Sequence, residues 1–253
     1  MNPIVVRNIA IGEGLPKICV PIVEQTKAEI LRLAEDIREM PADLVEWRAD
    51  WFVDVHQGEA VKELLKELRD HIGNMPILFT FRTEAEGGEQ SITEEEYVNL
   101  HKLAVDSGYV DLIDVEIFSM CKVADDIITY AKQAGVRVIG SNHDFLKTPK
   151  KEELIERLRK MQERGVDIPK IAVMPQSKED VLTLLSATEE MASNYADRPI
   201  ITMSMGEKGV ISRVSGELTG SAVTFGTAGK ASAPGQIPTN ELKVMLELLH
   251  EQS

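Results

Sequence analysis

The stretch Pro169-Lys170-Ile171-Ala172-Val173-Met174-Pro175 indicates how this chain folds. It is a short apolar run bounded by prolines, which is typical of a buried strand, and it contains one lysine. Lysine is rarely buried, because an unpaired ammonium group in a core loses its hydration. Lys170 therefore either extends to the end of its strand or has an amine that does chemistry. The stretch alone leaves both interpretations open.

Similar runs recur on both sides of this stretch. Each β-branched, apolar run of about six residues is followed by an amphipathic run with helical spacing. The expected strands are Ile18–Val23, Leu44–Arg48, Ile77–Arg82, Leu112–Glu116, Val136–Ser141, Lys170–Met174, Ile200–Met205 and Ala222–Phe225. The expected helices are Lys27–Met40, Glu59–Ile72, Glu94–Ser107, Met120–Ala134, Pro149–Arg164, Lys178–Tyr195, Lys208–Ser215 and Asn240–His250.

Several helix ends have their own signals. Thr93 stands three residues before Glu96, which predicts a capping box. Thr148-Pro149 predicts an N-cap followed by proline at the first helical position. Glycines at 108, 135 and 165 follow helical runs, where a left-handed residue is expected to end the helix.

The repeat predicts an α/β fold, a (β/α)₈ TIM barrel formed as one domain by residues 1–253. Two short β-prone runs around Arg7-Asn8 predict a hairpin within an N-terminal extension, residues 1–16. A doubly wound open sheet is the alternative, but Val20-Pro21-Ile22-Val23 lacks the glycine-rich turn that usually follows its first strand. In a barrel, the functional site belongs at the carboxyl ends of the strands.

Composition narrows the classes of function. The net charge of −14 argues against binding to nucleic acid or to an anionic membrane, because both need a basic face. No apolar run approaches the ~20 residues of a membrane span, and the first residues lack the apolar core of a signal peptide. Cys19 and Cys121 are far apart, so we expect a reducing cytoplasm and no metal site.

Polar residues gather where the predicted strands end. Arginine follows two of them, at Arg48 and Arg82, and His143 follows a third. Each arginine could pair structurally with a nearby acid, Glu46 or Glu86, or could hold a ligand carboxylate or hydroxyl. His143 could be a structural rim residue or a proton-transfer group.

The remaining candidates are also open to two interpretations. Met203 and Met205 are expected as apolar walls, and Arg213 alone resembles a surface charge. The small-residue loop after the last strand could be a linker or a lid, with Ser232 and Gln236 as hydrogen-bond donors.

Together these residues suggest Schiff-base lyase chemistry on a polyhydroxylated anionic substrate. The lysine amine would form an iminium that acidifies an adjacent C–H bond, and the histidine would move the proton. The residues by themselves do not separate an aldolase from a dehydratase.

Six motifs closely resemble those of type I 3-dehydroquinate dehydratase. They are Glu46-Trp47-Arg48, Phe79–Thr83 with Glu86-Gly87-Gly88-Glu89, Ser141–Phe145 with Lys147-Thr148-Pro149, Lys170–Gln176, Ile201–Gly206 and Ala231–Gln236. The resemblance runs from the N-terminal hairpin to the last helix. That family is a class I aldolase-like barrel that dehydrates 3-dehydroquinate to 3-dehydroshikimate by syn elimination in the shikimate pathway.

The resemblance implies a role for each candidate. Lys170 is the Schiff-base lysine, His143 the general acid and base, and Glu86 the group that holds His143. The residues that bind the substrate carboxylate and close the lid are Arg213, Ser232 and Gln236. Those that hold the ring hydroxyls are Glu46, Arg48 and Arg82. Those that line the apolar wall are Met203, Met205 and Phe225. The resemblance implies no metal and no organic cofactor. It implies a homodimer. Alternatives are a class I aldolase on a small sugar phosphate, for which Met205–Gly209 is a weak phosphate loop, and a non-catalytic binding barrel.

Overall fold

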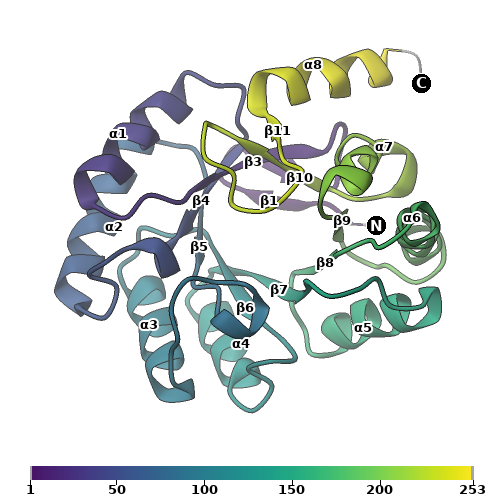
Figure 1. The fold of residues 1–253 in the computed structure, drawn as a ribbon. Helices are drawn as coiled ribbons and strands as arrows, with labels where there is room; N and C mark the ends of the chain where they lie inside the picture. The colour runs from purple at the N-terminus through teal and green to yellow at the C-terminus, as the bar shows by residue number, and fades with distance from the viewer. Residues whose placement is uncertain (1, 252–253) are drawn as a thin grey trace.

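The computed structural model describes residues 2–251; Met1, Gln252 and Ser253, which the predicted domain range includes, lie outside the described residues. A parallel sheet curls on itself, and helices cover its outer face (Figure 1). The strands lie in the order β11 (Ile237–Pro238), β10 (Val223–Thr227), β3 (Lys17–Ile22), β4 (Leu44–Arg48), β5 (Ile77–Thr80), β6 (Leu112–Glu116), β7 (Arg137–Asp144), β8 (Ile168–Val173) and β9 (Ile201–Ser204).

The helices follow the strands in the order that the repeat predicts. They are α1 (Lys27–Arg38), α2 (Gly58–Ile72), α3 (Glu94–Asp106), α4 (Ala124–Gln133), α5 (Lys151–Glu163), α6 (Lys178–Asn194), α7 (Gly216–Thr219) and α8 (Thr239–His250). Three short 3₁₀ helices are η1 (Ala49–Trp51), η2 (Glu84–Glu86) and η3 (Glu207–Arg213). Among residues 2–251, no helix has both the length and the apolar character needed to cross a membrane.

The sheet closes between β9 and β10. An isolated parallel bridge joins Ile200 to Ser221, and the amide of Ala222 donates to the carbonyl of Ile200 over 2.8 Å. Because β3 to β10 follow in sequential order and the last returns beside the first, the predicted barrel is confirmed and the open doubly wound sheet is wrong.

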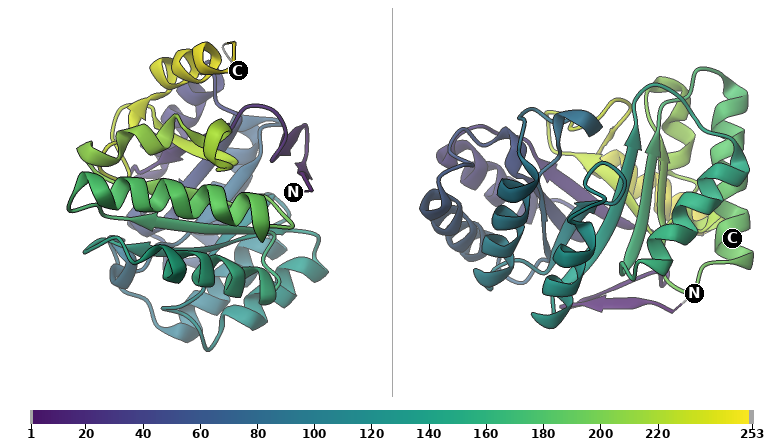
Figure 2. Two further views of the ribbon diagram at one scale, coloured as in Figure 1. Left: turned by 90° about the vertical axis from the view of Figure 1, so that its right-hand side faces the viewer. Right: turned by 90° about the horizontal axis from the view of Figure 1, so that it is seen from below.

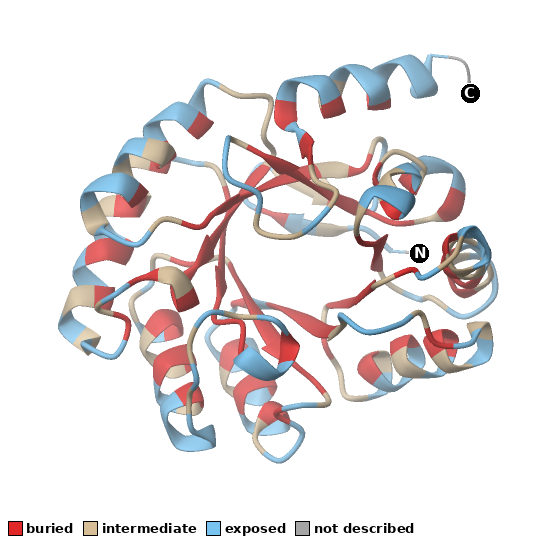
Figure 3. Cartoon of the chain, viewed as in Figure 1, coloured by how far each residue is buried: buried red, intermediate tan, exposed pale blue. Residues whose placement is uncertain are grey.

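Two apolar layers hold the barrel together. One lies between the strands and the helices, so the strands are buried along most of their length and each long helix mainly on its inner face (Figure 3). The other fills the amino-terminal half of the lumen, where Cys19, Leu44 and Leu78 meet residues of the N-terminal hairpin. Burying these surfaces stabilises the fold by roughly 25 cal/mol per Å².

The hairpin closes one end of the barrel, as Figure 2 shows. Its strands β1 (Ile4–Val6) and β2 (Ile9–Ile11) are antiparallel, and Arg7 in the turn has a positive φ of 51°. Val6 and Ile11 pack into the lumen layer, and Arg7 Nε lies 2.5 Å from Asp111 Oδ1. The predicted hairpin is therefore confirmed.

The signals at helix ends were right in most cases. The capping box of Thr93 with Glu96 is present, and the glycines at 108, 135 and 165 all have positive φ. The predicted cap at Thr148 is wrong: α5 begins at Lys151 after Lys150, and the buried Thr148 hydroxyl lacks a hydrogen-bond partner among the described residues.

The helix predicted at Lys208–Ser215 is instead the 3₁₀ helix η3, followed by the single turn α7. Gly209 packs directly on β9, where a Cβ would lie 2.1 Å from the Ser204 carbonyl oxygen. The Ser212 hydroxyl also accepts from the Ser204 amide over 2.9 Å. These contacts hold the segment too close to the strand for a regular α-helix.

Aspartates before alternate strands tie the amino-terminal end of the barrel together. Asp43, Asp111 and Asp167 precede β4, β6 and β8, and each accepts a backbone N–H from the preceding strand of the sheet, at 2.7, 2.8 and 2.8 Å respectively. Each therefore satisfies an amide at a strand end that the parallel ladder leaves without a partner.

We expect Asp167→Ala to lower the free energy of unfolding by about 1–3 kcal/mol, because the amide of Val138 loses its acceptor in a partly buried place. Asp167→Asn keeps an acceptor oxygen and should lose less than half of that. Urea unfolding followed by circular dichroism measures both. The exposed Asp70 serves as control, and an Asp167→Ala loss no larger than that of Asp70→Ala would refute the role of this contact.

Candidate active site

The lumen changes from apolar to polar along the strands. Alternate residues of a strand face the same side, so Leu112 of the lumen layer is followed on its face by Asp114 and Glu116. In β8, Ile168 is followed in the same way by Lys170. The carboxyl-terminal half of the lumen therefore holds buried charges, as expected for the catalytic end of such a barrel.

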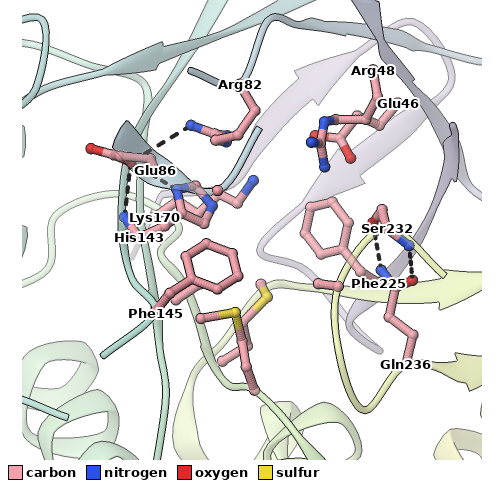
Figure 4. Close-up of a pocket in the computed structure, with 15 residues that line it drawn as sticks. Glu46, Arg48, Arg82, Glu86, His143, Phe145, Lys170, Phe225, Ser232 and Gln236 are labelled. Carbon is pink, nitrogen blue, oxygen red and sulfur yellow. Dashed lines mark hydrogen bonds and ion pairs between the residues drawn. The ribbon is translucent and has the colours of Figure 1, made fainter. Parts of the chain in front are cut away.

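A pocket of about 450 Å³ opens at this end (Figure 4). It contains every candidate residue from the sequence except Arg213. Its lining consists of Glu46, Arg48, Arg82, Glu86, Gly87, His143, Phe145, Lys170, Ala172, Met203, Met205, Phe225, Ser232, Ala233 and Gln236. Charged groups from four strands or the loops after them thus face one cavity, together with an apolar wall.

Lys170 lies inside the barrel. The strand begins at Ile168, so the lysine is its third residue, and its expected position at the strand start was wrong. The residue is 3% exposed, and its Nζ lies 3.1 Å from Asp114 Oδ2 and 4.7 Å from the centre of the Phe225 ring. Of the two sequence interpretations, extension to the strand end is excluded by this burial.

Asp114 of β6 binds side chains from the loop after β5, from β7 and from β8. Its Oδ1 accepts from Arg82 Nη2 at 2.8 Å and from Ser141 Oγ at 2.6 Å, while its Oδ2 accepts from Lys170. Burial raises the pKa of Asp114, but the cations of Arg82 and Lys170 outweigh that effect, so the pKa lies below its ordinary value. Asp114 thus stays a carboxylate and balances the buried lysine.

Arg48 pairs with another acid than the expected Glu46, whereas Arg82 pairs with the expected Glu86 and with further acids. Arg48 forms a bidentate pair with Asp50, at 2.8 and 2.7 Å. Arg82 Nη1 donates to Glu116 at 3.0 Å and forms a longer ion pair with Glu86 at 3.7 Å. Asp50 is as near to Arg48 in the sequence as Glu46 is, whereas Glu116 is distant from Arg82 in the sequence and is brought within reach by the barrel.

Glu46 forms a hydrogen bond with a hydroxyl and, within residues 2–251, no ion pair with an arginine. One carboxylate oxygen accepts from the Thr80 hydroxyl across the strand pair, at 2.9 Å. Its side chain faces the pocket beside Arg48, as Figure 4 shows. This carboxylate therefore has acceptor capacity left for a ligand hydroxyl.

His143 and Glu86 form a pair. Glu86 Oε2 accepts from both the backbone N–H and the Nδ1 of His143, at 2.9 Å each. Because a carboxylate only accepts, this geometry assigns the ring proton to Nδ1 and leaves Nε2 as an acceptor. Burial and then the cations of Arg82 and Lys170 lower the pKa of His143 well below its ordinary value, so the imidazole is neutral at pH 7.

The position of Glu86 depends on the turn that follows η2. Gly87 has a φ of 83°, and a Cβ there would lie 2.4 Å from the Phe145 ring. Phe145 thus packs on the glycine at the pocket mouth.

Burial, and then the charge of Glu116, raise the pKa of Glu86 to about 7.

The small-residue loop after β10 lies over the pocket. Gln236 Nε2 donates to the Ser232 hydroxyl, and Gln236 Oε1 accepts from the Ser232 amide, at 2.9 Å each. The loop is held to the barrel where Gly206 N–H donates to the Pro234 carbonyl at 3.1 Å, and Lys230 Nζ lies 3.7 Å from the centre of the Trp51 ring. This position fits a lid.

Arg213 lies behind the lid, not at the surface. It is 2% exposed and donates to two carbonyls, that of Pro234 at 3.0 Å and that of Phe225 at 3.5 Å. Its Nε has no hydrogen-bond partner, and no carboxylate of residues 2–251 pairs with it. Burial lowers the pKa of Arg213 to about 10. An unpaired buried guanidinium next to a pocket is prepared to bind an anion.

The sequence interpretation missed the acids that balance the cations: Asp50, Asp114 and Glu116. A signal existed, because Asp114 and Glu116 stand two residues apart in an otherwise apolar strand and must share one face. Within residues 2–251, no group of three or more His, Cys, Asp or Glu side chains is placed to hold a metal ion.

Comparisons with known proteins agree with this geometry. The family model described as type I 3-dehydroquinase matches residues 18–253. The 3-dehydroquinate dehydratases of Clostridioides difficile strain 630 and Salmonella agona strain SL483 are 54% and 53% identical over 97% and 99% of this chain, and over 96% and 100% of their own lengths.

Solved structures give the same result. The type I 3-dehydroquinate dehydratase of Clostridium difficile superposes with a TM-score of 0.97 at 53% identity, and the Geobacillus kaustophilus enzyme with 0.96 at 41%; each comparison covers 100% of both chains. Sequence, fold and geometry thus lead to one assignment: the chain belongs to the type I 3-dehydroquinase family.

Proposed function

We propose that this chain dehydrates 3-dehydroquinate to 3-dehydroshikimate through a Schiff base on Lys170. The observation that carries the proposal is the buried Lys170 amine in the same pocket as the unprotonated Nε2 of His143. A nucleophilic amine and a neutral base in one pocket are what iminium-assisted proton abstraction needs.

The reaction begins at the amine. Lys170 Nζ, after losing a proton, attacks the ketone carbon. The carbonyl oxygen takes up that proton and a second one from the attacking nitrogen, and leaves as water to give an iminium. His143 Nε2 then takes a proton from the adjacent carbon, and the C–H electrons form an enamine. The enamine expels the hydroxyl group, which takes the proton back from His143 and leaves as water. Hydrolysis of the conjugated iminium releases the product and restores the amine.

The stereochemistry follows from having one base. His143 both removes the proton and delivers it to the leaving hydroxyl, so both must lie on the face of the ring that the imidazole reaches. A syn elimination results. The depressed pKa of His143 assists the second half, because an imidazolium next to buried cations gives up its proton readily.

Substrate binding uses the remaining pocket residues. We assign the ring carboxylate to Arg213, Ser232 and Gln236, which now bond to backbone carbonyls or to one another and would exchange those contacts for the substrate. Glu46, Arg48 and Arg82 hold the hydroxyls by charge-assisted hydrogen bonds. The apolar wall is formed by Met203, Met205 and Phe225.

A relative supports a covalent route. The Clostridium difficile structure contains covalently modified comenic acid. An aldolase acting on a sugar phosphate fits less well, because Gly209 packs on the carbonyl of Ser204 and Gly206 lies beneath Gly235 of the lid, so the predicted phosphate loop is not open.

We further propose that the enzyme acts as a cytoplasmic homodimer. Val244, Met245 and Leu248 are exposed on α8 and offer an apolar surface to a second copy.

Borohydride in the presence of 3-dehydroquinate should fix the mass of the substrate on a peptide containing Lys170. Lys170→Ala should lose the adduct and lower kcat by roughly 10⁴-fold or more, because the covalent route disappears. Lys147→Ala, at an exposed lysine after β7, is the matched control and should keep the adduct. An adduct on Lys147 or Lys230 in the wild-type chain would contradict the assignment.

His143→Ala should still form the iminium, because Lys170 remains, but should lose about 10²–10⁴-fold in kcat. Borohydride trapping during turnover should therefore recover more adduct from this variant than from the wild type. Intact-mass spectrometry measures the fraction modified. Wild-type turnover in His143→Ala would end the acid–base assignment.

Arg213→Met should raise KM by about 10–100-fold, since a charge-assisted hydrogen bond is worth ~1.5–3 kcal/mol, and should change kcat little. The contact is made in both the ground and transition states. The variant should not lose thermal stability without substrate, because it removes a buried charge that no acid of the described chain balances. An unchanged KM, or a lower Tm, would argue that Arg213 has a structural role only.

A further inference from the structure

The hydroxyl of Ser119 lies between two buried carboxylates. Its Oγ is 2.8 Å from Glu86 Oε1 and 2.7 Å from Glu116 Oε2. The two glutamate side chains are 4% and 0% exposed. A serine hydroxyl has one hydrogen and can donate to only one of these oxygens. The second short contact therefore needs a hydrogen from elsewhere.

Glu116 already has its donors. Its Oε1 accepts from the Thr83 amide at 2.8 Å and from Arg82 Nη1 at 3.0 Å. Its Oε2 accepts from the Thr83 hydroxyl at 2.7 Å. An ionised carboxylate fits these contacts, and Ser119 adds one more donor. The hydrogen that the second contact of Ser119 requires therefore does not have to come from a protonated Glu116.

The two oxygens of Glu86 are unequal. Oε2 has two donors from His143, whereas Oε1 has Ser119 and the Asn142 amide at the longer distance of 3.4 Å. The orientation of that amide is set by Arg157, which donates to Asn142 Oδ1 at 2.8 Å. Oε1 is therefore the oxygen with room for a proton.

The surrounding charges favour a proton there. The acids around the site outnumber the cations: Glu46, Asp50, Glu86, Asp114 and Glu116 face Arg48, Arg82 and Lys170. Burial and Glu116 together raise the pKa of Glu86 to about 7, against the charge of Arg82 at 3.7 Å and against the hydrogen bonds that an ionised Glu86 accepts from Ser119 and from the His143 amide.

We propose that Glu86 carries a proton on Oε1 and donates it to Ser119, which donates its own hydrogen to Glu116. Ser119 is then a positioning residue that holds a buried acid pair with one shared proton. Oε2 remains an acceptor for His143 Nδ1 whether or not Oε1 is protonated, so the imidazole keeps the tautomer that leaves Nε2 free. Ser119 itself belongs to an exposed turn after β6 and does not line the pocket.

The chain of hydrogen bonds predicts in which direction removal of the Ser119 hydroxyl changes the pKa of Glu86. With Glu86 protonated, Ser119 takes part in two hydrogen bonds; with Glu86 ionised, it donates only one. Removing the hydroxyl thus costs the protonated form one bond more, and the pKa of Glu86 should fall by about one unit. A serine that only donated to the Glu86 carboxylate would have the opposite effect, because its removal would raise the pKa.

The kinetic consequence rests on the proposed function. When Glu86 binds its proton, the negative charge that favours the imidazolium of His143 is lost, and His143 becomes a weaker base. The value of kcat/KM should therefore fall as the pH drops through about 7 in the wild type. In Ser119→Ala the same fall should begin about one pH unit lower.

Infrared titration of the full chain with ¹³C-labelled glutamate tests the position of the proton. A protonated-carboxyl band should titrate near pH 7 and be absent from Glu86→Gln. Its midpoint should fall by about one unit in Ser119→Ala, and return to the wild-type value in Ser119→Thr, which keeps the hydroxyl. Ser193→Ala, at an exposed serine of α6 that bonds to Glu189, is the matched control and should leave the midpoint unchanged.

Three results would overturn the proposal: a midpoint that rises or stays unchanged in Ser119→Ala, a failure of Ser119→Thr to restore it, or the absence of a Glu86-dependent band. The kinetic profile separates this failure from that of the proposed function. If the infrared midpoint shifts as expected while kcat/KM does not follow, the shared proton is supported and the role of His143 as base is refuted.

Discussion

The contact of Asp114 with Lys170 and Arg82 is the constraint on which this site depends. Two cations in a barrel lumen would be unstable without a counter-charge, because neither keeps its hydration there. Asp114 supplies that charge at 3.1 Å from the lysine and 2.8 Å from the arginine. It comes from β6, one strand away from Arg82 and two from Lys170, so the pairing exists only when the sheet is curled in this register. Folding and charge balance are therefore linked, and the buried amine faces the pocket.

The same arrangement separates stability from function along the barrel axis. The amino-terminal half of the lumen is apolar and closed by the hairpin, while the carboxyl-terminal half holds the charges. Because burial of apolar side chains in the amino-terminal half stabilises the fold, the carboxyl-terminal half can retain groups that lower stability, such as the Arg213 guanidinium, which has no acid beside it. Those groups have the capacity to bind a ligand.

Sequence patterns predicted the strands and most of the helices, since each depends on the spacing of apolar residues within one segment. They also predicted most of the pocket residues, because the carboxyl ends of parallel strands meet at one end of a barrel, whereas Phe225 was implied only by the family resemblance. They misplaced the start of α5: Thr148-Pro149 has the composition of a cap, but the helix begins two residues later. They offered Glu46 as a partner of Arg48, which pairs instead with Asp50. They offered Glu86 as a partner of Arg82, which pairs with it but also with Asp114 and Glu116 from the next strand.

The sequence by itself determined the eightfold repeat, the hairpin around Arg7-Asn8, the presence of one lysine in an apolar strand, and that of a histidine and arginines near strand ends. These follow from local propensity and periodicity, which each segment carries independently of the others. Only the tertiary structure decided that Asp114 balances Lys170, that Arg213 is buried without an acid, and that Ser119 joins Glu86 to Glu116. These contacts join residues distant in sequence, and their distances are set by barrel register and closure. Hydrogen bonds and ion pairs depend on tenths of an ångström, which periodicity does not specify.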